Sequence, residues 1–103
     1  INDCILIDNA MNDVRDYLPK PDKNLIKKWL LTGAHYAAER GITNVHDAWQ
    51  SPEIIESMLE LVQENKMPIK CYGMIGASFK EYIKTFFNKG HHSGTNYKIR
   101  SVF

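Results

Sequence analysis

The sequence has no long apolar run, no excess of charge of either sign and no paired-cysteine motif. Its hydrophobic stretches fall short of the roughly 20 residues that a membrane span needs, and no charged-then-apolar signal segment is present. Lysine and arginine (13) and aspartate and glutamate (12) are mixed along the chain and give a formal net charge of +1. No basic surface for nucleic acid is indicated. We therefore expect a soluble, cytoplasmic protein that binds neither nucleic acid nor membrane.

Cysteine is scarce as well. Cys4 and Cys71 lie far apart and neither belongs to a C-x-x-C spacing, which favours reduced, buried thiols over a disulfide. The 103 residues, 44% of them hydrophobic, are enough for one compact domain or a piece of one, and too few for two. The chain begins at an isoleucine and stops at Phe103 inside a predicted strand, so we expect a segment of a longer protein.

Helix and strand signals alternate regularly from residue 22 onward. Asp22 and Ser51 suit helix N-caps, Gly41 suits the left-handed position that closes a helix, and 78–81 has the spacing of a capping box. Residues 89–96 are predicted to be loop. The expected helices are 22–40, 51–62 and 78–87, and the expected strands are 42–46, 69–75 and 97–103.

This alternation predicts an α/β fold of adjacent parallel strands joined by right-handed crossovers, with helices packed on the sheet. Three such strands make an incomplete layer. In a closed barrel they would supply three of the eight units. The loops 46–51 and 74–78 would then lie on the active face of the barrel, and 64–68 and 89–96 on the opposite face.

His46 and Asp47 are the leading site candidates, because they come where the 42–46 strand is predicted to end. Sites in parallel α/β folds are built at the carboxyl ends of strands. Histidine titrates near neutrality and aspartate can orient it. The alternative is structural: Asp47 caps the following loop and His46 fills the last core layer. Adjacent strand residues point to opposite faces, so we expect only one of the two to face any given cavity.

Other polar or aromatic groups are weaker candidates. His91 and His92 are neighbours, whereas metal-binding histidines are spaced so that their side chains converge, so a solvated loop is favoured. Residues 73–78 suggest a phosphate-binding turn but lack the full glycine pattern and the lysine. Trp29 and the pair Phe86 and Phe87 have helical spacing and are predicted to be core.

Five segments together resemble one family. Residues 41–48, G-I-T-N-V-H-D-A, resemble the second barrel strand of the amidohydrolase superfamily, and specifically its amidohydrolase family 3 branch. Residues 5–11 are similar to that family's G-x-L-x-D-x-A-M stretch, and 18–21 to its L-P-x-P linker. Residues 68–74 resemble its third strand and 97–102 the approach to its fourth. The resemblance covers most of the chain.

The resemblance implies a (β/α)8 TIM-like barrel that holds one or two divalent metals, usually zinc, whose activated water hydrolyses amide-type C–N bonds. Residues 1–21 would be the end of an insertion and a linker, and 22–103 the units of strands 2 to 4. The family's metal ligands lie on other strands, and its fourth-strand lysine would fall at about Phe103 or beyond. The chain is thus expected to lack the metal ligands and to be inactive alone.

The partners implied are the remainder of the parent barrel and, in that parent, a small amide-type substrate. The isolated segment is expected to self-associate, because excision from a barrel leaves open sheet edges and uncovered apolar surface. Two alternatives stay open. One is a free-standing small α/β binding or interaction module. The other is a flavodoxin-like phosphate binder that uses residues 73–78.

Overall fold

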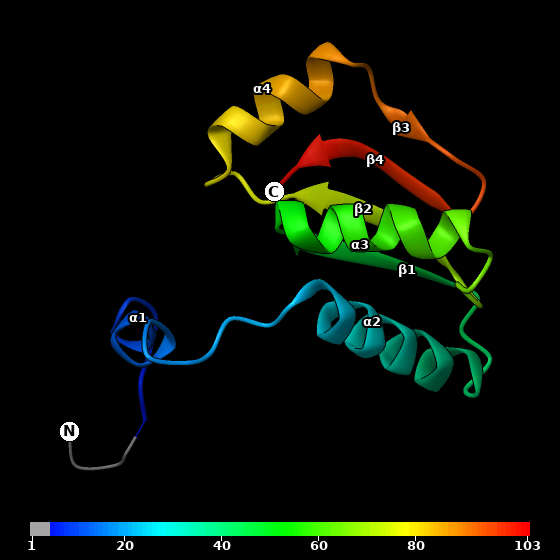
Figure 1. Cartoon of the computed structure of the whole chain (residues 1–103). Coiled ribbons are helices and arrows are strands. Elements are labelled where there is room, and N and C mark those ends of the chain that lie inside the picture. The colour runs from blue at the N-terminus through cyan, green and yellow to red at the C-terminus, as the bar shows by residue number, and fades with distance from the viewer. Residues whose placement is uncertain (1–4) are drawn as a thin grey trace.

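The computed structural model describes residues 5–103, so the prediction for Cys4 lies outside the described residues. Within them the chain forms four helices and one four-stranded sheet (Figure 1). The helices are α1 (Ala10–Arg15), α2 (Lys23–Ala38), α3 (Pro52–Gln63) and α4 (Lys80–Asn88). The strands are β1 (Asn44–Gln50), β2 (Lys70–Ile75), β3 (His92–Ser93) and β4 (Tyr97–Val102).

The sheet has the order β1-β2-β4-β3. β1 pairs with β2 in parallel, and β2 pairs with β4 in parallel, so the prediction of three adjacent parallel strands joined by helices is confirmed. The prediction that 89–96 is entirely loop is wrong. β3 lies within it and pairs antiparallel with β4, and Arg100 donates hydrogen bonds to the Ser93 hydroxyl across the two strands.

The predicted helix ends of the first two units are confirmed. The Asp22 carboxylate accepts a hydrogen bond of 2.8 Å from the Leu25 amide and so caps α2. The Ser51 hydroxyl accepts one of 3.4 Å from the Ile54 amide at the start of α3. Gly41 follows α2 with φ +76, the left-handed conformation that glycine adopts without strain.

The capping box predicted at residues 78–81 is wrong. Helix α4 begins at Lys80, and the preceding residue, Phe79, makes no side-chain cap hydrogen bond. The Phe79 ring instead packs against Trp49, with the ring centroids 5.1 Å apart. Contact between two large aromatic rings outweighs one hydrogen bond at an exposed helix start.

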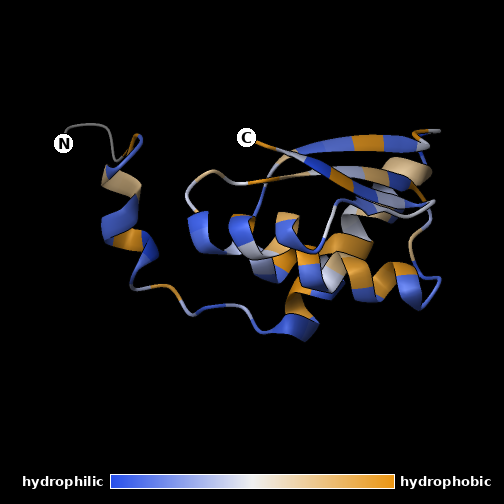
Figure 2. Ribbon diagram, turned by 90° about the horizontal axis from the view of Figure 1, so that it is seen from above, coloured by the Kyte–Doolittle hydropathy of each residue, from blue (hydrophilic) through white to orange (hydrophobic). Residues whose placement is uncertain are grey.

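The helices α2, α3 and α4 lie together on one side of the sheet, as Figure 2 shows. Apolar residues of α3 and α4 pack on a core that includes the buried side chains of Ile55, Met58, Cys71, Ile75, Tyr97 and Ile99. No helix in residues 5–103 covers the opposite face of the sheet. Tyr72 is half-buried on that face, and its strand neighbours His46 and Lys98 are exposed.

Helix α1 stands apart from this body, at the far end of an extended connection (Figure 1). None of its residues is buried. No helix formed by residues 5–103 is both long enough and apolar enough to span a bilayer.

Candidate functional site

His46 and Asp47 do not lie at the end of their strand, so that prediction is wrong. β1 continues to Gln50, so His46 and Asp47 lie in the middle of this strand, where they pair with Tyr72 and Gly73 of β2. The register shifts between Asp47 and Gln50, and Gln50 pairs with Ile75. Because this bulge turns Gln50 inward, where it is fully buried, the strand gains a polar residue that alternation alone does not predict.

The two candidate side chains point to opposite faces, as strand alternation predicts. The exposed His46 ring lies against Tyr72 on the face without helices, with the ring centroids 5.3 Å apart. Asp47 is half-buried and turns toward the helices, where it contacts Gln50. The two side chains therefore lie on opposite faces of the sheet, although both residues contribute to the lining of the cavity described below.

Asp47 belongs instead to a buried polar network. Gln50 Nε2 donates a hydrogen bond of 2.9 Å to Asp47 Oδ2, and the Tyr97 hydroxyl donates to Gln50 Oε1. Gln50 and Tyr97 are fully buried. Gly73 makes the space for them, because a Cβ there would clash with Gln50 Oε1 and lie 2.9 Å from the Tyr97 hydroxyl.

Sequence reasoning missed Gln50 and Tyr97 as members of this network. A glycine inside an apolar strand, here Gly73, signals that another group approaches the backbone closely. Gly73 is visible in the sequence, but it does not identify the residues that approach it, since Gln50 and Tyr97 come from two different strands.

Burial controls the ionisation of the groups around the network. It raises the pKa of the Cys71 thiol to about 11, and the nearby Asp47 carboxylate adds to the shift. Burial likewise raises the pKa of the Tyr97 hydroxyl far above its usual range, helped by Cys71 and Asp47. Tyr97 therefore stays a neutral hydrogen-bond donor. Cys71 is a free, buried thiol, as predicted, and at neutral pH it is a poor nucleophile.

A large cavity of about 1000 Å³ lies beside this network, between α2 and the helix-facing side of β1. We call it the α2–β1 groove. Its walls are mainly apolar, and Asp47 and Gln50 are among its polar lining residues. Trp29 also lines it and is 57% exposed, so the prediction that Trp29 is core is wrong. The reason is that α2 packs against α3, so the part of its apolar face that carries Trp29 stays uncovered.

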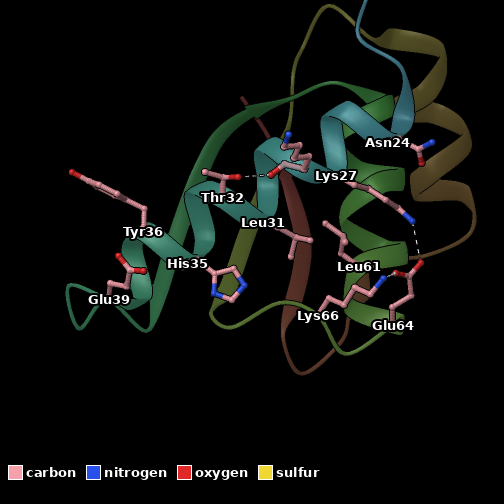
Figure 3. A pocket seen from close by; sticks show the side chains of 11 residues that line it. Asn24, Lys27, Leu31, Thr32, His35, Tyr36, Glu39, Leu61, Glu64 and Lys66 are labelled. Carbon is pink, nitrogen blue, oxygen red and sulfur yellow. Dashed lines mark hydrogen bonds and ion pairs between the residues drawn. The ribbon is translucent and has the colours of Figure 1, made fainter.

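A second hollow, of about 890 Å³, lies on the outer side of α2 and α3 (Figure 3). Lys27 Nζ bridges the two helices, 2.6 Å from Glu60 Oε2 and 3.0 Å from Glu64 Oε1. Hydrogen bonds from Lys23 and Lys27 lower the pKa of Glu60 to about 2. The side chains of Glu60 and Glu64 are 38% and 40% exposed and that of Lys27 is 19% exposed, so water screens these ion pairs and they join α2 to α3 only weakly.

The remaining candidates do not assemble a site. His91 packs edge-on against Phe87 and His92 against Tyr97, at ring centroid distances of 5.1 and 5.8 Å, so the two imidazoles diverge as expected. Gly76, in the segment that suggests a phosphate-binding turn, lies so close to the indole of Trp49 that a Cβ there would clash with the ring. No three His, Cys, Asp or Glu side chains within residues 5–103 gather closely enough to hold a metal ion.

Comparisons of the chain with protein-family models, with curated proteins and with solved structures found no match.

Proposed function

We propose that this chain is the segment of strands 2 to 4 of a (β/α)8 barrel in a metal-dependent amidohydrolase, an enzyme that hydrolyses C–N bonds. The observations that support the proposal are the order of the parallel strands and the single face of the sheet that the helices cover. The parallel strands β1, β2 and β4 are neighbours in chain order, and the helices α2, α3 and α4 share one face. Strands keep this order and helices stay on one face around a whole barrel and also within each half of a doubly wound sheet. The resemblance of residues 41–48 and 68–74 to the amidohydrolase strands is what favours the barrel.

In such a barrel the face without helices would be the interior. His46 and Tyr72 lie on that face, so His46 is the candidate residue that would reach the parent's active site. Asp47, turned toward the helices, has a structural role in the network with Gln50 and Tyr97. His46 by itself is not a metal site, and the described residues do not fit a zinc ion. The ligands would come from the remainder of the barrel, and zinc would supply the activated water in the parent.

Metal dependence tests this function. The isolated chain is expected to bind zinc weakly and to hydrolyse no N-acyl amino acid, whereas the longer protein that carries it is expected to hydrolyse one. That activity should be lost on treatment with a chelator and restored by added zinc. Tight, stoichiometric zinc binding by the isolated chain in equilibrium dialysis would contradict the proposal, as would a longer protein that cleaves amide bonds equally well without metal.

We predict that His46→Ala in the longer protein lowers kcat about 100-fold or more, because positioned acid-base groups contribute on this scale. The melting temperature should change little, since a side chain that faces the active site is not part of the packed core, and the ring contact that the structure shows for His46 is with Tyr72. His35→Ala is the matched control, because His35 is exposed on the outer side of α2. An unchanged kcat with a melting temperature lower by several degrees would show that His46 is structural.

The α2–β1 groove favours a second candidate, a free-standing binding module. A mainly apolar cavity of about 1000 Å³ with a few polar groups has the character of a small-molecule site. Saturable protection of the isolated chain by an apolar ligand, measured by thermal shift and lost in a variant that fills the groove, would favour this candidate.

A further inference from the structure

Tyr72 is held at both ends on the face of the sheet without helices. Its backbone belongs to β2, which pairs with β1 on one side and with β4 on the other. Its hydroxyl donates a hydrogen bond of 3.3 Å to Ser101 Oγ on β4. The side chain is half-buried, and among residues 5–103 it does not belong to the apolar core. Tyr72 thus presents a fixed ring on a face that lies away from the core.

His46 has the Tyr72 ring as its neighbour across the strands. The two residues are register partners, so their side chains share one face of the sheet. Their ring centroids lie 5.3 Å apart and the ring planes are inclined by 35°, a separation within the roughly 4.5 to 7 Å that aromatic pairs prefer. The imidazole is exposed, and without this neighbour several of its rotamers would be open. The Tyr72 ring therefore limits the directions in which the imidazole can point.

We propose that Tyr72 is a positioning residue, whose ring holds the His46 imidazole in the orientation that it presents to the interior of the parent barrel. This role rests on the proposed function, in which His46 reaches the active site. A catalytic side chain acts only within a narrow range of orientations, so a neighbour that restricts it raises kcat without touching the substrate. The ring makes the contact while the hydroxyl binds Ser101. The role therefore requires an aromatic ring at residue 72 but no phenol.

A double-mutant cycle in the longer protein tests this role. Tyr72→Leu removes the ring and should lower kcat about two- to tenfold, the range that a ring contact supplies. Tyr72→Phe is the conservative variant, which keeps the ring and should recover most of the activity that Tyr72→Leu loses. In a His46→Ala background, Tyr72→Leu should cause no further loss, because the imidazole that it positions is gone. Tyr36→Leu is the matched control, since Tyr36 lies on the outer side of α2 and is 60% exposed.

Nuclear magnetic resonance on the 103-residue chain measures the ring contact without any enzymatic activity. The ring current of a tyrosine shifts the resonances of nearby protons. The His46 imidazole resonances should therefore move in Tyr72→Leu and stay in place in Tyr72→Phe, while those of His35, exposed on the outer side of α2, stay unchanged in both. Dispersed backbone resonances show that a variant folds. Tyr72→Val, whose side chain suits a strand, takes the place of Tyr72→Leu if the latter does not fold.

Three results would overturn the positioning role. The first is a set of His46 resonances that Tyr72→Leu leaves unchanged. The second is a loss of kcat that is equally large with and without His46, because Tyr72 would then act independently of the imidazole. The third is a kcat that falls with His46→Ala but not with Tyr72→Leu, which would leave the proposed function standing. Failure of the proposed function is distinguishable: His46→Ala would then leave kcat unchanged while the ring-current shifts persist, and the positioning role would be refuted with it.

Discussion

Gly73→Ala is expected to lower the free energy of unfolding by about 2 to 5 kcal/mol, which combines an overpacking cost with the loss of buried hydrogen bonds. A Cβ at this position would clash with Gln50 Oε1. The Gln50 side chain is fully buried and is held by two hydrogen bonds, since it donates to Asp47 and accepts from Tyr97, and a move away from residue 73 would lengthen them. Relief of the clash therefore requires that at least one of these hydrogen bonds break.

Urea unfolding followed by circular dichroism measures this effect. Gly33→Ala is the matched control, since a Cβ there meets nothing within 4 Å in a helix, and it should stabilise the chain by about 0.5 to 1 kcal/mol. In a Gln50→Ala background the added cost of Gly73→Ala should shrink, because the clashing atom is gone. An additive double mutant, or a Gly73→Ala variant as stable as the unmodified chain, would show that the network does not restrict this position.

Tyr97→Phe is the second large effect, and we expect it to cost about 1 to 3 kcal/mol. The substitution keeps the buried ring and removes the hydroxyl that donates to Gln50 Oε1, so a buried carbonyl oxygen loses its donor. Tyr72→Phe is the control. Its hydroxyl is 3.3 Å from Ser101 Oγ on the face without helices, and the change should stay within about 0.5 kcal/mol. Equal losses in the two variants would contradict the special role of Tyr97.

Tyr97→Phe should also change how the free energy of unfolding depends on pH in alkaline solution. Burial raises the pKa of Tyr97 above that of an unfolded tyrosine, which is about 10. The folded state therefore keeps the hydroxyl neutral while the unfolded state ionises. This contribution to stability is complete below pH 10 and decreases as the pH rises further. Unfolding measured between pH 9 and 11 should thus depend less steeply on pH in Tyr97→Phe, with Cys71 still contributing in both proteins.

The parallel part of the fold follows from local sequence signals. Asp22, Ser51 and Gly41 mark helix ends through chemistry that acts within a few residues, and the apolar runs between them predict buried strands. The pairing of β3 with β4 could not be predicted in this way. It depends on β3, which lies outside any periodic pattern and whose two residues are too few to show alternation.

The site was predicted less well than the fold, because its geometry depends on contacts between distant residues. The bulge after Asp47 moves Gln50 into the core, and nothing in residues 42–50 indicates that the strand continues there. Tyr97 reaches Gln50 from another strand, 47 positions away in the sequence. Only the divergence of His46 and Asp47 could be predicted, since it follows from strand alternation alone.

The most direct test of the proposed barrel segment is the coding sequence on either side of residues 1–103. We predict an H-x-H motif upstream of the apolar run at Ile5 and histidine-bearing strands downstream of Phe103. An open reading frame that begins within a few codons of Ile1 and stops directly after Phe103 would contradict the proposal and favour the free-standing module.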